Sequence, residues 1–568
     1  RRGHDVIPRL ATRGKLVLAT ALLFLLVGAL HGAPPLVGLA GMILTVLLAL
    51  YMAFYPTAIL LRRKKIELSW WVPPGDQPGG ALSADRPFQL HLAFRNHGSR
   101  RLRILYTQVL GASGLGLEER PSATVNRGQQ VEVTTTVKPL VAGYHVLHGA
   151  ALTFGDALGL FDIEAFFPNP IAVKVFPRTL ALRTQAIRAI GGALHEQVGL
   201  HHVRRRGLSG ELRELREHTH GDPFKFIAWK ATARRQQLMV RDLENEIVTT
   251  HVVMLDVGAG MRQGPLGRAP IDWGCDATAA LAKAAIGSSD RVGLVGFDTR
   301  PLVELAVDTG HHHYLQIIDR MLDVRSLVDA DLTDVTAGEL VALVARYLAH
   351  QEAIDVRIKI APPLDDPRWT QIQAGPDGQL YDVAATGRLC KRLIDAMVGK
   401  DGKDSKDAKD KKPKLPPVVE EDSSLRPLRQ FCRLRGIELP YRSTWEHGKR
   451  AAGFAAAVER AVATGRPDVV VIISDLSGFA EDEARTRRAL ARLRKAAGTV
   501  IALVPSAAGF LPQATTPHGR RVRELVIRDQ RAALEPGRRL LVRHGIMVLE
   551  GSPLTSLDQL LHGRRVAA

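Results

Sequence analysis

The first part of the chain is dominated by one long apolar stretch. No Asp, Glu, Lys or Arg occurs at residues 16–61, whereas a single bilayer crossing needs about 20 apolar residues. Residues 31–35 (HGAPP) interrupt this stretch with one glycine and two prolines. The pattern predicts two transmembrane helices, near residues 16–32 and 36–58, in an N-terminal hairpin segment of residues 1–65.

Basic residues flank this hairpin on both sides. Arg9, Arg13 and Lys15 precede the first span, residues 62–65 (RRKK) follow the second, and the turn between them has no Lys or Arg. The positive-inside rule therefore predicts a multi-pass protein of the cytoplasmic (inner) membrane with its soluble domains in the cytoplasm. A secretory signal peptide is the competing interpretation, which the second span disfavours. Because the chain starts at Arg1, we expect that a few residues precede it.

Residues 66–178 have the alternation of β-strands. Phe88, Leu90, Leu92 and Phe94 alternate with more polar residues, and residues 131–137 repeat the pattern. This period of two, separated by turn residues, predicts a small antiparallel β-sandwich. No group of chemically active side chains stands out in it, which favours a spacer or protein-contact module.

The pattern of apolar residues changes near residue 248. Continuous apolar runs at residues 249–256 (TTHVVMLD), 291–297, 467–475 and 499–504 alternate with helical patterns at residues 272–286, 447–464 and 481–495. Such alternation predicts an α/β domain over residues 248–568, with a doubly wound, mostly parallel sheet covered on both faces. Asp256 and Asp475 end two of these strands, at the edge where open α/β sheets bind ligands.

One segment interrupts this predicted domain. Residues 323–445 lie between the second and third strand patterns and include residues 400–414 (KDGKDSKDAKDKKPK). With almost no apolar side chains, such a run cannot offset the entropy of ordering. We therefore predict an insertion at 323–445 that contains a disordered run at 399–424.

Composition restricts the possible partners. The 568 residues carry 77 Lys and Arg against 58 Asp and Glu, a formal charge of +19, which favours anionic partners. Nucleic-acid binding would show steep salt dependence, but the charge is spread along the chain without an aromatic-rich basic module, so we do not expect it. The three cysteines, Cys275, Cys390 and Cys432, are too few and too scattered for a disulfide framework.

Residues 207–246 contain the most unusual run of the chain, GLSGELRELREHTHGDPFKFIAWKATARRQQLMVRDLENE. The spacing of Leu212 and Leu215 among charged residues predicts a short helix there. The run resembles the signature of the domain of unknown function 58 (DUF58) family, and we assign residues 179–247 to this signature segment. The resemblance implies a von Willebrand factor A-like domain after it and a MoxR-type AAA+ ATPase as partner.

The charged residues of this signature can be interpreted in two ways. A satisfied polar network against the following domain is favoured over a ligand or partner site, because buried Arg and Asp must be paired. Ala228 stands where the family usually has Asp, which weakens a catalytic role. The predicted network comprises Glu211, Arg216, Asp222, Trp229, Lys230, Arg234 and Arg241.

The resemblance also implies where a metal ion would bind. Metal-binding von Willebrand A domains use Asp-x-Ser-x-Ser with a Thr and a second Asp, oxygen ligands that suit Mg²⁺. Here Asp256 is followed by Gly258 and Gly260 at the two hydroxyl positions, while Thr309 and Asp475 could match the other ligands. We therefore expect no cofactor and at most a weak Mg²⁺ site at Asp256, Thr309 and Asp475.

These observations favour a membrane-tethered scaffold or adaptor over an enzyme. Its partner-binding face would comprise Asp256, Gly258, Gly260, Thr309 and Asp475. The alternative is a hydrolytic or metal-assisted enzyme that uses Asp256 and Asp475 with His218 or His220. The run of histidines at 311–313 cannot converge on one ion from a helix, so we interpret it as the start of a surface helix.

Overall fold

The computed structural model describes residues 6–562 except 63–64, 73–81, 113, 118–120, 179, 181, 183–211, 221, 223, 244–247, 353, 364, 401–417, 421, 464–465 and 554. The chain divides into two compact units. The first comprises residues 1–178, 265–267 and 322–444, and the second comprises residues 179–264, 268–321 and 445–568.

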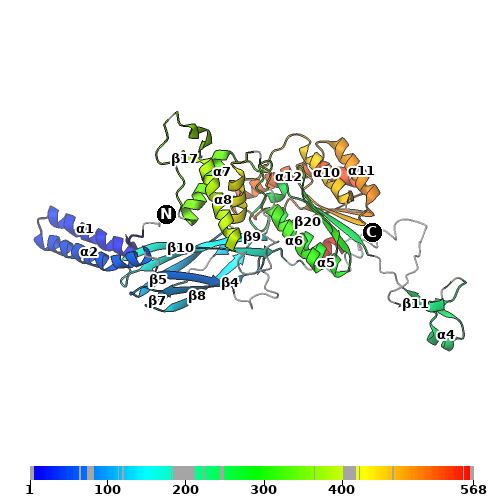
Figure 1. Cartoon of the computed structure of the whole chain (residues 1–568), viewed down its shortest axis with the longest axis horizontal. Helices are drawn as coiled ribbons and strands as arrows, with labels where there is room; N and C mark the ends of the chain where they lie inside the picture. The colour runs from blue at the N-terminus through cyan, green and yellow to red at the C-terminus, as the bar shows by residue number, and fades with distance from the viewer. Residues whose placement is uncertain are drawn as a thin grey trace. The chain divides into compact units, whose positions relative to one another are not determined.

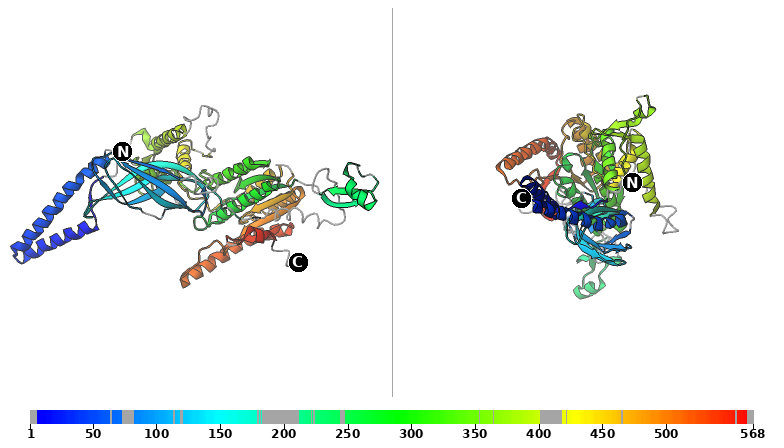
Figure 2. Two further views of the ribbon diagram at one scale, coloured as in Figure 1. Left: turned by 90° about the horizontal axis from the view of Figure 1, so that it is seen from below. Right: turned by 90° about the vertical axis from the view of Figure 1, so that its left-hand side faces the viewer.

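The first unit begins with two apolar helices. Helices α1 (Thr12–Leu30) and α2 (Pro34–Arg62) lie side by side as an antiparallel pair (Figures 1 and 2). Pro34 and Pro35 occupy the first turn of α2, where a missing N–H costs no intrahelical hydrogen bond. By length and composition both helices could cross a membrane, as the uncharged stretch predicts.

Two β-sheets accompany the helices in this unit, with strand β1 before α1 and the other strands after α2. One has the order β1-β10-β9-β5-β7, with β3 also pairing with β10, and the other has the order β2-β4-β8-β6. All described pairs are antiparallel except the β3–β10 pair. Their bounds are Arg9–Leu10 (β1), Ile66–Trp71 (β2), Leu82–Ser83 (β3), Phe88–Asn96 (β4), Leu102–Gly111 (β5), Leu115–Leu117 (β6), Ala123–Val125 (β7), Gln130–Pro139 (β8), Gly143–Gly155 (β9) and Phe161–Phe176 (β10).

The predicted insertion at 323–445 is grouped with the first unit, which includes residues 322–444. The hydroxyl of Tyr347 lies 2.8 Å from Nδ1 of His148 on β9, and the ring of Tyr347 packs on Phe431. Most of the predicted disordered run 399–424 lies outside the described residues, but Val418 is buried among these helices. The elements are α7 (Ala337–Gln351), η4 (Pro367–Gln371), β16 (Ile372–Ala374), β17 (Leu380–Asp382), α8 (Val383–Lys400) and α9 (Arg426–Arg435).

The second unit is built on a six-stranded sheet with the order β15-β14-β13-β18-β19-β20. Four neighbouring pairs are parallel, and only the edge strand β15 is antiparallel. The strands are β13 (Thr250–Asp256), β14 (Arg291–Phe297), β15 (Pro301–Asp308), β18 (Val469–Ile473), β19 (Thr499–Pro505) and β20 (Met547–Gly551). The chain is thus mixed α/β, as predicted.

Alternate residues of these buried strands pack against helices on opposite faces. Met254 and Ile472 share a core with Phe454 and Leu490, whereas Leu255 and Ile473 lie against Gly274 of α5. One face is therefore covered by α10, α11 and the end of α12, and the other by α5. The helical elements are η3 (Gly260–Arg262), α5 (Pro270–Gly287), α6 (His311–Arg325), α10 (Lys449–Ala463), α11 (Glu483–Ala496), α12 (Pro517–Arg543) and α13 (Leu557–His562).

The described part of the signature segment forms a β-hairpin with a short helix. Strand β11 (Leu212–Glu217) pairs antiparallel with β12 (Met239–Leu243), and η2 (Phe224–Phe226) and α4 (Trp229–Arg235) lie between them in the chain. The predicted helix at residues 212–217 is therefore wrong. Its local i, i+3 spacing of leucines is overridden by the backbone pairing with β12.

Candidate functional site

Three aspartates meet at the carboxyl edge of the parallel strands. Asp256 is the last residue of β13, Asp298 follows β14 directly, and Asp475 comes two residues after β18. Asp256 pairs in register with Phe297, and Leu255 pairs with Ile473, so the three strand ends are neighbours. The side chains of Asp256 and Asp298 are fully buried, and that of Asp475 is 17% exposed.

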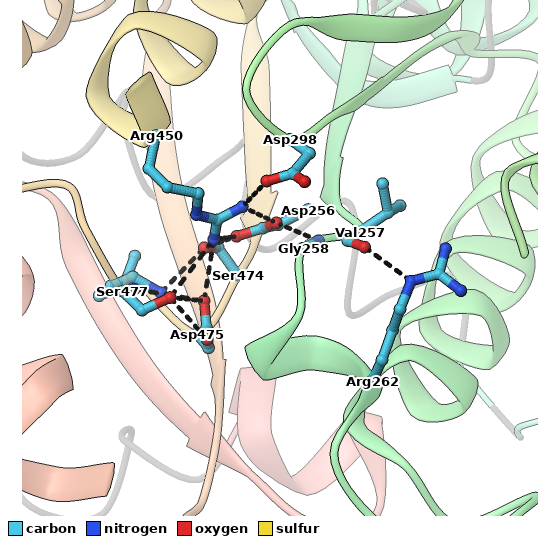
Figure 3. Close-up of polar contacts among 10 residues, drawn as sticks. Asp256, Val257, Gly258, Arg262, Asp298, Arg450, Ser474, Asp475 and Ser477 are labelled. Carbon is cyan, nitrogen blue, oxygen red and sulfur yellow. Dashed lines mark hydrogen bonds and ion pairs between the residues drawn. The ribbon is translucent and has the colours of Figure 1, made fainter. Parts of the chain in front are cut away.

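One arginine bridges the three carboxylates of this cluster. Arg450 belongs to α10, and its side chain is 7% exposed. Its Nη1 and Nη2 donate to the two carboxylate oxygens of Asp256 at 3.0 and 2.8 Å, and Nη1 also donates to Oδ1 of Asp298 (Figure 3). Nη2 further donates to Oδ1 of Asp475 at 3.3 Å. Bidentate, charge-assisted bonds of this kind are the strong ones in proteins.

Two serines and a backbone amide complete the arrangement. The hydroxyl of Ser474 donates to Oδ2 of Asp256 at 2.5 Å, and that of Ser477 donates to Oδ2 of Asp475 at 2.8 Å. The amide N–H of Gly258 donates to Oδ1 of Asp256 at 2.9 Å. Asp256 and Asp475 thus each have several donors, as a buried charge requires.

The electrostatics of the cluster follow from burial and mutual charge. Burial disfavours the charged guanidinium, but the carboxylates of Asp256, Asp475 and Asp298 outweigh it and hold the pKa of Arg450 well above its usual value. Burial, together with the charge of Asp256, raises the pKa of Asp475 to about 6, although Arg450 and Ser477 oppose the shift. Asp475 shares the single cation Arg450 with two other carboxylates, so repulsion from Asp256 adds to the effect of burial.

The loop after Asp256 contains glycine because the cluster leaves no room for a side chain. A Cβ built on Gly258 would overlap Nη1 of Arg450 and lie 2.7 Å from its Cζ. A Cβ on Gly260 would overlap Oδ2 of Asp475. Gly258 and Gly260 are the two positions at which hydroxyl ligands were predicted to be lost. Arg450 and Asp475 occupy the space that a side chain at these positions would need.

The oxygen atoms present would suit a hard divalent cation, but the guanidinium already satisfies them. Asp256, Asp298 and Asp475 with two serine hydroxyls form an oxygen set of the kind that Mg²⁺ prefers. Arg450 bridges all three carboxylates, and among the described residues no group of three His, Cys, Asp or Glu side chains is arranged to hold a metal ion. The residues as they stand do not fit a metal ion.

The predicted site residues are only partly brought together. Asp256, Gly258, Gly260 and Asp475 lie at one site, whereas Thr309 does not. Asp308 pairs with Val292 at the start of β14, while Pro301 pairs with Phe297 at its end, so the antiparallel β15 carries Thr309 to the opposite edge of the sheet. The placement of Thr309 beside the aspartates is therefore wrong.

Within the signature segment, the structure joins two of the predicted network residues. The guanidinium of Arg216 makes two 2.7 Å hydrogen bonds to the carboxylate of Asp222, which also accepts from the amide of Thr219. The hydrogen bonds from Arg216 and Thr219 hold the pKa of Asp222 well below its usual range. Trp229 is 64% exposed, Lys230, Arg234 and Arg241 are exposed, and Glu211 lies outside the described residues. The ring of His218 lies 6.3 Å from that of Phe224, and His220 is exposed.

Sequence reasoning did not identify Asp298 and Arg450. Asp298 follows the apolar run 291–297, so the rule that selected Asp256 and Asp475 applies to it as well. Arg450 lies four, eight and eleven residues before Phe454, Val458 and Ala461, which are all buried on α10. A charged residue on the apolar face of a helix must be paired, and this was the available signal.

Comparison with known proteins places the segment around β13 and β14 in a family. Residues 214–345 match the family described as "Protein of unknown function DUF58". This match confirms the resemblance carried by residues 207–246. A search of curated proteins finds no match.

Solved structures give only distant similarities. The FixG-related protein of Vibrio parahaemolyticus is 11% identical over 20% of this chain and 97% of its own, with a TM-score of 0.14. A β-glucosidase of Listeria innocua is 12% identical over 19% and 16%, with a TM-score of 0.12. The α-2-macroglobulin of E. coli is 10% identical over 84% and 26%, with a TM-score of 0.15. Similarities at these TM-scores carry no argument about this chain.

Proposed function

We propose that the chain is a membrane-anchored adaptor that binds protein partners through the strand-end face of a von Willebrand A-like, doubly wound domain. The parallel order of β14, β13, β18, β19 and β20, with α5 and α10 on opposite faces, supports this fold assignment. In open sheets of this kind ligands bind beyond the carboxyl ends of the strands. The cluster of Asp256, Asp475 and Arg450 lies at that edge.

The observation that carries the proposal is the pairing of Arg450 with all three carboxylates. A metal-dependent A domain uses a divalent cation to hold its acidic residues together, whereas here a guanidinium of α10 bridges them. The carboxylates of this face are then hydrogen-bonded before any partner arrives. Preorganised surfaces bind partners without the cost of ordering.

We propose further that the soluble units face the cytoplasm. The apolar helices α1 and α2, with basic residues before the first and after the second, support a hairpin that enters and leaves the membrane on the cytoplasmic side. Such a multi-pass anchor would hold the adaptor at the inner membrane and limit its partners to those that reach this surface.

The partner we propose is a MoxR-type AAA+ ATPase, which the family resemblance implies. The full chain, extracted in mild detergent, is expected to retain this ATPase through affinity purification in the presence of nucleotide. Recovery of the chain alone, with and without nucleotide, would contradict the proposed partner.

A second candidate is a hydrolytic enzyme, and one observation favours it. The pKa of Asp475 is raised to about 6 and its carboxylate accepts from Ser477, a combination found at catalytic carboxylates. This function would use Asp475 as a general acid or base with Asp256 beside it. It requires loss of a measurable hydrolytic activity in a folded Asp475→Asn variant, whereas the adaptor function predicts unchanged, background hydrolysis.

A further inference from the structure

A tight turn between β9 and β10 presents one apolar side chain to the outside. The carboxylate of Asp156 accepts hydrogen bonds from the backbone amides of Leu158, Leu160 and Phe161, at 3.1, 2.7 and 2.9 Å. These bonds fix the turn, yet the side chain of Leu158 at its tip is 56% exposed. The turn therefore holds one exposed leucine in a fixed position, and its surroundings decide what that leucine can contact.

This turn is joined directly to the start of the first apolar helix. The amide of Ala11 donates to the carbonyl of Leu160 at 2.9 Å, and a Cβ on Gly14 of α1 would overlap the same carbonyl. Gly159 has a φ of +70°, and a Cβ built on it would lie 3.9 Å from the side chain of Arg13. The tip of the turn therefore lies at the level where α1 begins.

Helix α2 also contacts the β-sheet part of the first unit, near the same end of the helix pair. Arg100 donates from Nη1 to the carbonyl of Ala53 on α2 at 3.0 Å, and the ring of Tyr51 lies 5.7 Å from that of Phe161. An arginine is strongly disfavoured in hydrocarbon, so this contact places the headgroup layer near Ala53 and ends the membrane-embedded part of α2 before the predicted residue 58. Tyr51 and Tyr55 are residues of the type that lines this interface.

Basic side chains surround the turn at this level. Arg13 and Lys15 are exposed at the start of α1, and Nη1 of exposed Arg103 donates to the carbonyl of Ala157 at 3.4 Å. The acidic residues nearby are engaged or outnumbered. Asp156 holds the turn, Glu164 pairs with Arg9 at 3.5 Å, and Asp162 lies within electrostatic reach of Arg9 and Lys15.

We propose that the β9–β10 turn and the start of α1 form a binding site for anionic phospholipids. Leu158 would lie in the boundary between headgroups and acyl chains, and Arg13, Lys15 and Arg103 would contact the headgroup phosphates. The inference rests on the proposed membrane anchorage and extends it from tethering to lipid selection. Apolar contact combined with basic residues is the usual chemistry of interfacial binding, and each basic residue near an anionic surface strengthens it.

The test uses the full chain in lipid nanodiscs with a fluorophore on an introduced cysteine. Cys275, Cys390 and Cys432 are buried, so a cysteine at an exposed position is labelled selectively. Three labelled variants are compared: Leu158→Cys in the turn, Arg86→Cys near the start of β4, and Leu22→Cys in the middle of α1. Strand β4 has nine residues, which places its two ends about 30 Å apart.

Shallow spin-labelled lipids are expected to quench the Leu158→Cys label at least twofold more than the Arg86→Cys label. Spin-labelled phosphatidylglycerol is expected to quench it more than spin-labelled phosphatidylcholine, and Arg13→Gln/Lys15→Gln should remove this preference. Equal quenching at Leu158→Cys and Arg86→Cys, or by the two headgroups, would overturn the proposal while quenching at Leu22→Cys persists. If deep spin-labelled lipids fail to quench Leu22→Cys as well, the membrane anchorage itself is wrong.

Discussion

Arg450 is the residue on which the strand-end cluster depends. It is buried, and its three carboxylate partners come from the ends of different strands. A buried ion pair is only weak evidence of net stability, because desolvation opposes the attraction. Removing one partner is different, since it leaves charges buried without compensation.

Replacing Arg450 with methionine is therefore expected to lower the free energy of unfolding by about 3–5 kcal/mol, because Asp256 and Asp298 lose their cation. Chemical denaturation of the full chain in detergent measures this loss. Arg460 is a matched control on the same helix, since its side chain is 60% exposed and pairs with Glu304. Arg460→Met should cost less than about 1 kcal/mol. Equal losses in the two variants would show that the cluster is not a stability determinant.

The raised pKa of Asp475 predicts a specific pH dependence of the stability of the folded protein. Its pKa in the folded protein is about 6, above the value near 4 that an unfolded aspartate has. The folded state then holds this proton more tightly, so the contribution of Asp475 to stability falls as pH rises from about 4 to about 6. Asp475→Asn should flatten this part of the stability profile, whereas Asp529→Asn, at an exposed position, should leave it unchanged. Superimposable profiles for wild type and Asp475→Asn would contradict the assignment.

Removal of divalent metal gives a third prediction at this scale. Because Arg450 already bridges the carboxylates, excess chelator should leave the Tm of the wild-type chain unchanged within error. Differential scanning fluorimetry measures the effect directly. A fall of several degrees that Mg²⁺ reverses would mean that an ion, and not the guanidinium alone, holds the site.

At the scale of elements, the loop from β13 to α5 is shaped by the guanidinium. A methyl group at position 258 would collide with Arg450, so Gly258→Ala should destabilise the domain by about 1–3 kcal/mol. Gly287, the last residue of α5, has open space around a built Cβ and provides the control. Gly287→Ala should be neutral or slightly stabilising. If Gly258→Ala costs as much in an Arg450→Met background as in the wild type, the collision is not the cause.

Elements with continuous or regular patterns could be predicted from the sequence. The runs at 249–256 and 291–297 became β13 and β14, and the helical pattern at 447–464 became α10. The segment at 212–217 could not be predicted in this way, because its strand depends on a partner more than 20 residues away. Asp256 and Asp475 could be predicted because one ends a buried strand and the other follows one closely. Thr309 was misplaced because the sequence does not reveal that β15 runs antiparallel.

At the scale of the whole molecule, sequence order and structural grouping differ. Residues 322–444 interrupt the sheet of the second unit in sequence but are grouped with residues 1–178 in space. Hydrophobic periodicity shows which face of a helix or strand is apolar, but not which distant element packs against that face. The contact of Tyr347 with His148 therefore could not be predicted. The apolar helices, by contrast, are evident from composition alone.

The affinity of the full chain for the MoxR-type ATPase, measured for two matched variants, tests the central claim most directly. Ala259→Arg adds bulk and charge to the partly exposed loop after Asp256, and Thr309→Arg makes the same kind of change at the opposite edge of the sheet. The account predicts that Ala259→Arg weakens binding at least tenfold, or about 1.4 kcal/mol, and that Thr309→Arg changes it less than twofold. Equal affinities for the two variants, or a loss confined to Thr309→Arg, would contradict a partner-binding face at the carboxyl ends of the strands.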